Sequence, residues 1–208
     1  MEREFHDEPV RGLPEELPSG EAILWQGAPR VWALAVQALG LPYVAAGFVA
    51  VFAWQVGLGL RSADLITAMG NASFFLWLGG FACALIFVVA FVQARATIYT
   101  ITNRRVALRI GTAMTLTFNL PYSRIAAAHL ARGPGGTGTV TLTPAPGGAD
   151  LSYLLLWPHV RPWQTRPVEP ALRCIADAER VAALLAEAAE DCLAMPQVAR
   201  TEQRIAAE

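Results

Sequence analysis

Residues 31–60 read VWALAVQALGLPYVAAGFVAVFAWQVGLGL, and residues 65–94 read LITAMGNASFFLWLGGFACALIFVVAFVQA. Neither run contains Asp, Glu, Arg, Lys or His over its 30 residues. About 20 helical residues cross the hydrocarbon core of a bilayer, where every backbone polar group must be satisfied within the segment. The two runs therefore predict a two-helix transmembrane hairpin, with core sections near residues 34–58 and 74–92. A buried hairpin of a soluble protein is the alternative.

The composition of the whole chain agrees with a membrane protein. Of its 208 residues, 54% are hydrophobic and 16% are charged, and the mean hydropathy is +0.39. A soluble domain carries about 25% charged residues. The net charge is −1 and all 16 basic residues are arginine, so no polycationic surface for nucleic acid is expected. Three cysteines, odd in number and far apart, exclude a disulfide framework.

The distribution of arginine predicts the orientation of the hairpin. No acidic residue occurs between residues 95 and 132. The arginines of this segment are Arg95, Arg104, Arg105, Arg109, Arg124 and Arg132. Because positive loops stay on the cytoplasmic side, both termini are expected in the cytoplasm. The chain is thus predicted to be a multi-pass protein of a bacterial cytoplasmic or intracytoplasmic membrane.

The absence of ionisable groups from both runs bears on function. Transporters and proton relays place charged or histidine side chains inside the membrane, and so would a subunit that ligates a pigment. The hairpin is therefore interpreted as an anchor or as a packing surface for other helices. A small transporter or channel subunit would need oligomerisation to form a pore and is disfavoured.

Residues 95–195 predict a cytoplasmic β domain, because apolar residues alternate with polar ones between Gly- and Pro-containing turns. The expected strands are residues 96–102, 105–110, 114–120, 124–131, 139–143, 150–157 and 172–175. Asp177 then caps a helix whose apolar face is Val181, Leu184, Leu185, Ala188 and Cys192, and which ends before Pro196. Seven strands and one C-terminal capping helix form the pleckstrin-homology (PH) arrangement. The predicted fold is an α+β membrane protein with a PH-like domain.

The remaining residues are assigned to two tails. Residues 1–30 are a polar, acidic tail and lead-in, interpreted as mobile over residues 1–20, with a docking peptide as the alternative. Residues 196–208 are the C-terminal tail.

No pattern in the sequence supports catalysis, a cofactor or a metal ion. Residues 133–138, GPGGTG, resemble a phosphate-binding loop but lack its Lys-Ser/Thr ending, so a hairpin turn is expected there. His6, His129 and His159 share no ligand spacing with one another or with the cysteines. The chain is expected not to be an enzyme.

Two groups of residues are candidates for binding. Arg104, Arg105 and Arg109 follow the second apolar run closely and are predicted to seat the domain on the membrane surface or on an acidic partner. Trp157, Arg161 and Trp163 lie in a Pro-stiffened segment, and Trp and Arg are frequent in interface hot spots. We therefore interpret the second group as a partner contact. Capping of the core and seating on the membrane are equally simple explanations.

Several segments carry a resemblance to known proteins. EAILWQGAP at 21–29, YTITNRR at 99–105 and LPYSRI at 120–125, together with the hairpin, resemble bacterial membrane-anchored PH proteins. LLLWPHVRPW at 154–163 and LRCIADAERVAALLAEA at 172–188 are more specific. With them, the chain from residue 21 to about 189 resembles the PuhB family, the photosynthetic-complex assembly proteins of purple bacteria.

The resemblance implies a non-catalytic factor that helps assemble the photosynthetic reaction centre and its core antenna, without a cofactor or pigment of its own. Its partners would be reaction-centre subunits or core antenna polypeptides, with membrane lipids around the helices and a homo-oligomer as a further option. Members are sometimes described with a third membrane segment, but residues 151–157 are too short to span. The alternative is a general PH-like module that binds lipid headgroups or another membrane protein.

Overall fold

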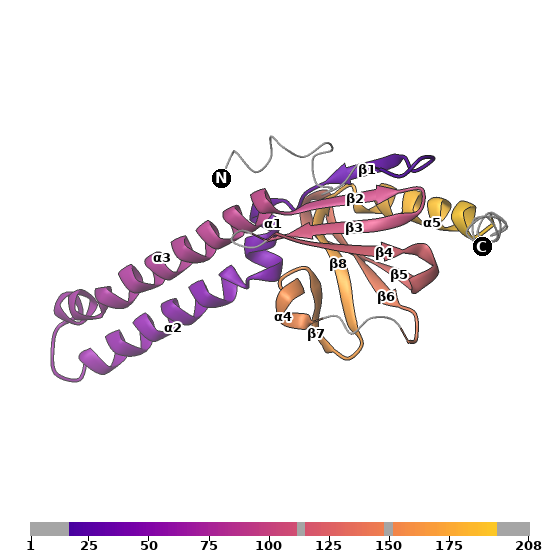
Figure 1. The fold of residues 1–208 in the computed structure, drawn as a ribbon. Coiled ribbons are helices and arrows are strands. Elements are labelled where there is room, and N and C mark those ends of the chain that lie inside the picture. The colour runs from indigo at the N-terminus through magenta and orange to yellow at the C-terminus, as the bar shows by residue number, and fades with distance from the viewer. Residues whose placement is uncertain (1–16, 112–114, 148–151, 195–208) are drawn as a thin grey trace, which may run out of the picture.

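The computed structural model describes residues 17–111, 115–147 and 152–194 and consists of a helical hairpin and a β domain (Figure 1). The hairpin projects from one end of the domain, and the C-terminal helix lies toward the opposite end. Residues 1–16 and 196–208, which hold most of the two expected tails, lie outside the described residues.

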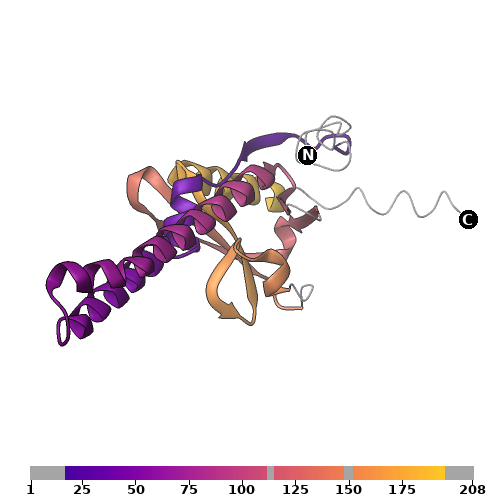
Figure 2. The same ribbon diagram turned by 90° about the vertical axis from the view of Figure 1, so that its left-hand side faces the viewer.

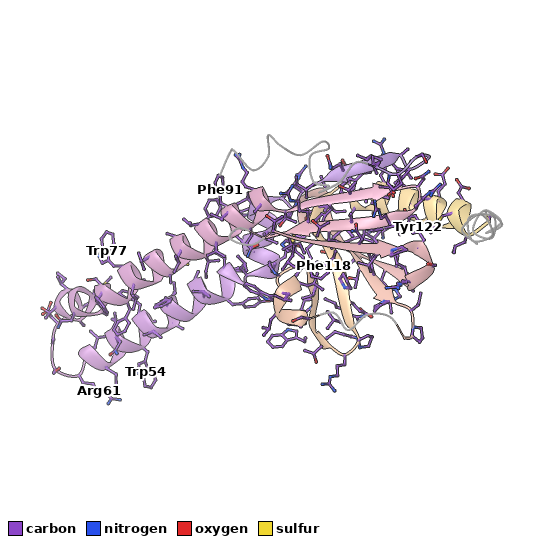
Figure 3. The ribbon with its side chains drawn as sticks, viewed as in Figure 1. Trp54, Arg61, Trp77, Phe91, Phe118 and Tyr122 are labelled. Atoms are coloured by element: carbon purple, nitrogen blue, oxygen red, sulfur yellow. The ribbon has the colours of Figure 1, made fainter. Side chains whose placement is uncertain are left out.

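The hairpin consists of α2 (Leu41–Gly59) and α3 (Leu65–Ala96), which run side by side in both views (Figure 2). At 1.5 Å per residue these helices are about 28 and 48 Å long. Both are long and apolar enough to cross a membrane, and their most apolar windows are only 0% and 11% buried. Trp54 and Trp77 point away from the hairpin (Figure 3). Such exposure is not that of a core helix in a soluble protein, so it favours the predicted membrane hairpin over the soluble alternative.

Small residues allow the two helices to approach each other closely. A Cβ atom added to Gly79 would lie 2.6 Å from the Cβ of Phe48, and one added to Gly59 would lie 2.9 Å from the Cβ of Ala68. The adjacent Gly80 has open space at the same point. One glycine of the pair therefore serves contact within the hairpin, and the other faces outward.

The first apolar run is broken before it becomes a long helix. It begins with α1 (Val31–Ala33) and a π-helical turn, η2 (Leu34–Ala38), and then bends at Gly40, which has a φ of +71°. Pro42 lies in the first turn of α2, where its missing N–H costs no hydrogen bond within the helix. Leu34 is fully buried in a small cluster with Cys174 of the domain. The apolar section expected to begin at residue 34 thus starts inside the protein, and the candidate span begins at Leu41.

The domain contains two four-stranded antiparallel sheets, with strand orders β1-β2-β3-β4 and β5-β6-β8-β7. The strands are β1 (Ile23–Gly27), β2 (Ile98–Thr102), β3 (Arg105–Ile110), β4 (Leu116–Pro121), β5 (Ile125–Arg132), β6 (Thr137–Pro144), β7 (Val160–Thr165) and β8 (Val168–Ala176). The helical elements between and after them are η3 (Tyr122–Arg124), η4 (Pro134–Gly136), α4 (Tyr153–Leu156) and α5 (Ala178–Ala194).

The core lies between the sheets and is closed by α5. Alternate residues of the strands face inward, because side chains alternate along a strand with a period of two. The fully buried members include Tyr99, Ile101, Val106, Leu108, Val140, Leu142, Leu172 and Ile175. Of the predicted apolar face of the helix, Val181, Leu185 and Ala188 are buried and Leu184 and Cys192 pack against the same core. That helix is confirmed.

The predicted count of seven strands is wrong, because the described residues form eight. Residues 23–27, assigned to the tail and lead-in, form β1 and pair with β2. Residues 160–165 form β7, an edge strand, where a proline is tolerated because its missing N–H faces outward. β8 is longer than the expected strand at 172–175.

One predicted strand is replaced by a helix. Within residues 150–157, where a strand was expected, the described part forms α4 at Tyr153–Leu156. A short continuous apolar run has no periodicity that separates a strand from a buried helical turn. The start of the third expected strand, at residue 114, lies outside the described residues, and β4 begins at Leu116.

Candidate functional site

The three arginines predicted to seat the domain do not form one surface. β2 continues from α3 and runs away from it, so the turn that contains Arg104 lies at the end of the β2–β3 hairpin remote from the helices (Figure 1). Arg104 is exposed there. Arg109 pairs with Ile98 near the end of α3 and is only 6% exposed.

Arg105 is engaged inside the protein. Its Nε donates to Oε1 of Glu21 at 2.8 Å and its Nη2 donates to Oε2 at 3.1 Å. The Thr102 hydroxyl also donates to Glu21, whose side chain is 3% exposed. A two-pronged ion pair of this kind fixes position as well as adding energy. Arg105 therefore holds the start of the chain against the β2–β3 hairpin.

The segment predicted to contact a partner carries exposed apolar side chains. Leu154 is 84% exposed, Leu155 54%, Trp157 44% and Trp163 96%, and we call these four residues the Leu/Trp surface. Leu156, in the same short helix, is fully buried and ties α4 to the core. The exposure of Leu154 and Leu155 therefore does not result from a loosely attached helix.

Arg161 lies on β7 between these tryptophans but is partly committed to an ion pair. Its Nη1 donates to Oε2 of Glu169 at 3.0 Å, and the Thr143 hydroxyl donates to Oε1 of the same carboxylate at 3.0 Å. Glu169 is buried, whereas half of the Arg161 side chain is exposed. Arg161 is thus available to a ligand on one side only.

A buried polar network joins the hairpin to the domain. Tyr99 accepts a hydrogen bond from the backbone N–H of Arg173 at 3.2 Å, and its own hydroxyl donates to Nδ1 of His159 at 2.6 Å. Nε2 of His159 then donates to the hydroxyl of Thr97, which follows the last residue of α3, at 3.1 Å. This assignment of protons gives a neutral His159 and places it between α3, β2 and β8.

The environment keeps His159 uncharged. Burial lowers the pKa of His159 to about 3, and the positive charge of Arg173 acts in the same direction. Burial also raises the pKa of Tyr99 well above its ordinary value, so the phenol stays protonated. His159 is fully buried and serves in the structure as a neutral hydrogen-bonding group rather than as a pH sensor at the surface.

Arg173 is the buried charge at this junction. Its Nη1 donates to the Pro158 carbonyl at 3.3 Å and its Nη2 donates to the Gln37 carbonyl at 3.2 Å. Within the described residues, its Nε has no hydrogen-bond partner and no carboxylate pairs with the guanidinium. One guanidinium thereby links η2, which precedes the candidate span, to the segment between α4 and β7. Pro158, which follows Trp157 of the Leu/Trp surface, consequently lies close to η2 at the base of the helical hairpin.

A cavity of about 560 Å³ opens beside Arg173. It lies between η2 and the second sheet. Its polar lining includes Gln37, His129, Arg132, Thr141, Arg161 and Arg173. Sequence reasoning missed Arg173 and the cavity, because the lining comes from five separate elements and no two of its three arginines are close in sequence.

No metal centre is found in the part of the chain that the structure describes: no three His, Cys, Asp or Glu side chains gather there in a way that could hold an ion. The groups that do converge at the cavity are hydrogen-bond donors and positive charges. Such an arrangement is suited to binding an anion.

Comparison with known proteins places the chain among its relatives. The sequence profile of the bacterial PH domain family matches residues 31–189. A Rhodobacter capsulatus protein, described as an uncharacterized 23.7 kDa protein in the puhA 5′ region, is 42% identical over 199 residues, which cover 95% of this chain and 92% of the relative. No solved structure matches the chain. The extent of the profile match, which includes the hairpin and seven of the eight strands, means that the chain belongs to the bacterial PH domain family.

Proposed function

We propose that the protein is a non-catalytic, membrane-anchored assembly factor for the photosynthetic reaction centre and core antenna, of the PuhB type. The observation that carries this proposal is the relative in the puhA 5′ region, which is similar over nearly its whole length. The gene puhA is a reaction-centre gene. The sequence resemblance at residues 154–163 and 172–188 points the same way.

The proposal places α2 and α3 in the bacterial cytoplasmic or intracytoplasmic membrane, with the β domain and both termini in the cytoplasm. Arg95 in the last turn of α3 and the acid-free segment after it support this orientation. Only Thr97 separates α3 from β2, so the domain is held close to the membrane without a flexible linker. A rigid connection of this kind keeps any surface at the base of the hairpin within reach of neighbouring membrane proteins.

In this proposal the hairpin packs beside newly inserted helices, and the Leu/Trp surface, with Arg161, contacts the cytoplasmic portion of a reaction-centre or antenna subunit. Exposed Trp and Leu side chains on a firmly held segment support that role, because buried aromatic anchors dominate most interfaces. Among the arginines expected to seat the domain, Arg104 is assigned to contact with an acidic partner. Arg105 has its own carboxylate partner in Glu21.

A second candidate function is a general PH-like module that binds lipid headgroups. The specific observation in its favour is the arginine-lined cavity at the base of the hairpin. It predicts a role in cells that grow without photosynthesis, whereas the assembly proposal predicts a role only in cells that build photosynthetic complexes.

Deletion of the gene in its native host tests the proposal. Membrane absorption spectra and growth are compared in light and in dark respiration. Loss of the reaction-centre and core-antenna bands with normal dark growth supports the assembly function. Unchanged spectra, or an equal defect in both growth modes, refute it and favour the headgroup-binding module.

Point variants then test the assigned surface. Leu154→Ser with Trp163→Ser removes two of its most exposed side chains, which contribute little to folding because they are 84% and 96% exposed. Leu193→Ser is the matched control, since Leu193 is 61% exposed on α5, away from the hairpin. We expect a lower yield of core complex only in the double variant, at an unchanged membrane level of the protein itself. Normal yield would mean that the partner binds elsewhere.

A further inference from the structure

We propose that the free edge of β5 binds an extended, acidic segment of another membrane protein, which pairs with β5 as an added strand. β5 is an outer strand of the second sheet, and among the described strands it pairs only with β6. The inference deepens the proposed function and rests on it for the kind of protein that supplies the segment. It concerns a surface separate from Trp163, which lies on β7 at the opposite edge of the same sheet.

The four edge strands differ in how they are protected against pairing. An edge strand presents unpaired N–H and C=O groups, and proteins shield it with short length, proline, charge or a bulge. β1 has only five residues and a bulge, β4 ends at Pro121, and β7 contains Arg161 and Pro162. β5 has eight residues, no proline, and no Asp, Glu, Lys or Arg before its last residue, and its bulge is confined to the Ile125 end. It is therefore the least protected of the four edges.

The β5–β6 hairpin shows which backbone groups of β5 point outward. The N–H of Gly133 donates to the Thr137 carbonyl at 2.7 Å, so these two residues form a hydrogen-bonded pair. Hydrogen-bonded and non-hydrogen-bonded pairs alternate along an antiparallel ladder. In the register that continues from this pair, Arg132, Leu130 and Ala128 occupy non-hydrogen-bonded positions. Their N–H and C=O groups therefore point away from β6, toward the free edge.

The side chains along this edge leave room for another backbone. Every residue from Ala128 to Arg132 is exposed, and alanine is small enough for a second strand to approach to the usual spacing of about 4.8 Å. The Arg132 end of β5 lies beside η2, because the Gln37 amide donates to the Thr137 hydroxyl at 3.2 Å in the same hairpin. The free edge thus starts next to the membrane hairpin, where cytoplasmic segments of neighbouring membrane proteins also begin.

The charges at this edge decide the occupant. Arg124 precedes β5 and Arg132 ends it, and both are exposed, whereas neither β5 nor β6 contains Asp or Glu. A second copy paired antiparallel about Ala128 would place its Arg132 opposite Arg124, and like charges directly opposite each other destabilise a strand pair. A segment with a carboxylate near each end would meet both arginines favourably. Arg132 also donates to Glu179 of α5, but its side chain is 78% exposed and stays accessible.

The test uses the purified full-length chain in a neutral detergent. The probe is a synthetic peptide as long as β5, with alternating Thr and Val between a Glu at each end and with isotope-labelled carbonyls. One control peptide carries Lys in place of Glu, and the other is methylated on its backbone nitrogens. By titration calorimetry and infrared spectroscopy, we expect the Glu peptide to bind one-to-one as a strand and to bind more weakly with added salt. Both control peptides should bind at least about tenfold more weakly.

Three variants locate the binding. Ala128→Pro removes an outward N–H without breaking a bond to β6, which an edge strand tolerates, and Ala128→Val keeps that N–H. We expect the Pro variant to bind the Glu peptide at least about tenfold more weakly than the Val variant. Arg124→Glu, at an exposed position outside β5, should reverse the preference in favour of the Lys peptide. This variant leaves the strand itself unchanged, so it tests the edge even if the Pro variant fails to fold.

Each outcome decides one part of the reasoning. Equal binding of the Glu and Lys peptides would overturn the acidic occupant, and equal binding of the methylated peptide would overturn strand pairing. A dimer that forms without peptide and is lost in Ala128→Pro would identify a second copy as the occupant and overturn the proposal. No saturable binding, together with loss of core complexes in the gene deletion, would refute this inference alone. Saturable, charge-dependent binding together with normal complexes in the deletion would support the site and refute the proposed function.

Discussion

Acidification from about pH 7.5 to about pH 5 is expected to destabilise the β domain through His159. This side chain is fully buried and makes hydrogen bonds to Tyr99 and Thr97 in its neutral form. A proton on Nδ1 would remove the acceptor that the Tyr99 hydroxyl uses, and it would place a second positive charge near Arg173. Protonation is therefore compatible with the unfolded chain but not with the packed network.

The magnitude follows from the two pKa values of this one group. Burial lowers the pKa of His159 from an ordinary value of 6.5 to about 3 in the folded protein. Between these values the unfolded chain holds one more proton than the folded chain, so stability falls as the pH falls, by about 1.4 kcal/mol per pH unit. At pH 5 the loss is about 2 kcal/mol relative to neutral pH. The loss stops growing below about pH 3, where the folded protein also takes up the proton.

The assay compares wild type with His159→Phe in detergent or nanodiscs by thermal and denaturant unfolding at both pH values. The Phe variant is less stable at pH 7.5, because two hydrogen bonds are lost, but it has no group to titrate at this position. The stability difference between the two proteins should therefore shrink by about 2 kcal/mol at pH 5. His129→Phe, at an exposed position, is the matched control for the substitution itself. A stability difference that is the same at both pH values would refute the neutral, buried His159.

Three further predictions concern packing and pairing. Arg105→Met leaves the buried carboxylate of Glu21 without its cation and should cost about 3 kcal/mol of unfolding free energy. Adding Glu21→Gln to that variant should recover part of the lost stability, which a double-mutant cycle measures. Gly79→Ala should push α2 away from α3, because the added Cβ would lie 2.6 Å from the Cβ of Phe48. The efficiency of cysteine cross-linking between the two helices should therefore fall. Gly80→Ala is the control, and it should leave this efficiency unchanged because Gly80 has open space at its Cβ position. Leu156→Ala should cost about 2–5 kcal/mol as a core truncation, whereas Leu154→Ala should stay within about 0.5 kcal/mol, both measured by denaturant unfolding. Equal costs at the two leucines would contradict the way α4 is seated.

The sequence was most informative where a single physical signal dominates a long segment. The two uncharged runs predicted two long apolar helices, and the spacing of Val181, Leu185 and Ala188 predicted α5, because both patterns are local and extend over several turns. β4 was predicted from Leu116, Phe118 and Leu120 for the same reason. The strands that were missed depend on partners distant in sequence. β1 has little alternation of its own and is defined by pairing with β2, more than 70 residues away.

The candidate site could be predicted only in part. The exposure of Trp163 agrees with the interpretation of its segment as a contact surface, but a cluster of arginines in sequence did not become a cluster in space. Arg104 and Arg105 follow β2 to the far end of its hairpin, and Arg105 is neutralised by Glu21, whose position depends on β1. Charge counted along the chain therefore overestimates the charge available at a surface whenever an acid from a distant strand reaches it.

The same reasoning explains why the sequence did not indicate Arg173 as a buried charge at the base of the helical hairpin. Arg173 lies within a β-strand whose flanking residues are apolar, and nothing local distinguishes it from a surface arginine. Its burial results from η2 covering the second sheet. Only the structure shows that, among the described residues, its guanidinium donates to the carbonyls of Gln37 and Pro158 and pairs with no carboxylate. A buried charge that bonds only to backbone carbonyls holds two segments together at a cost in desolvation.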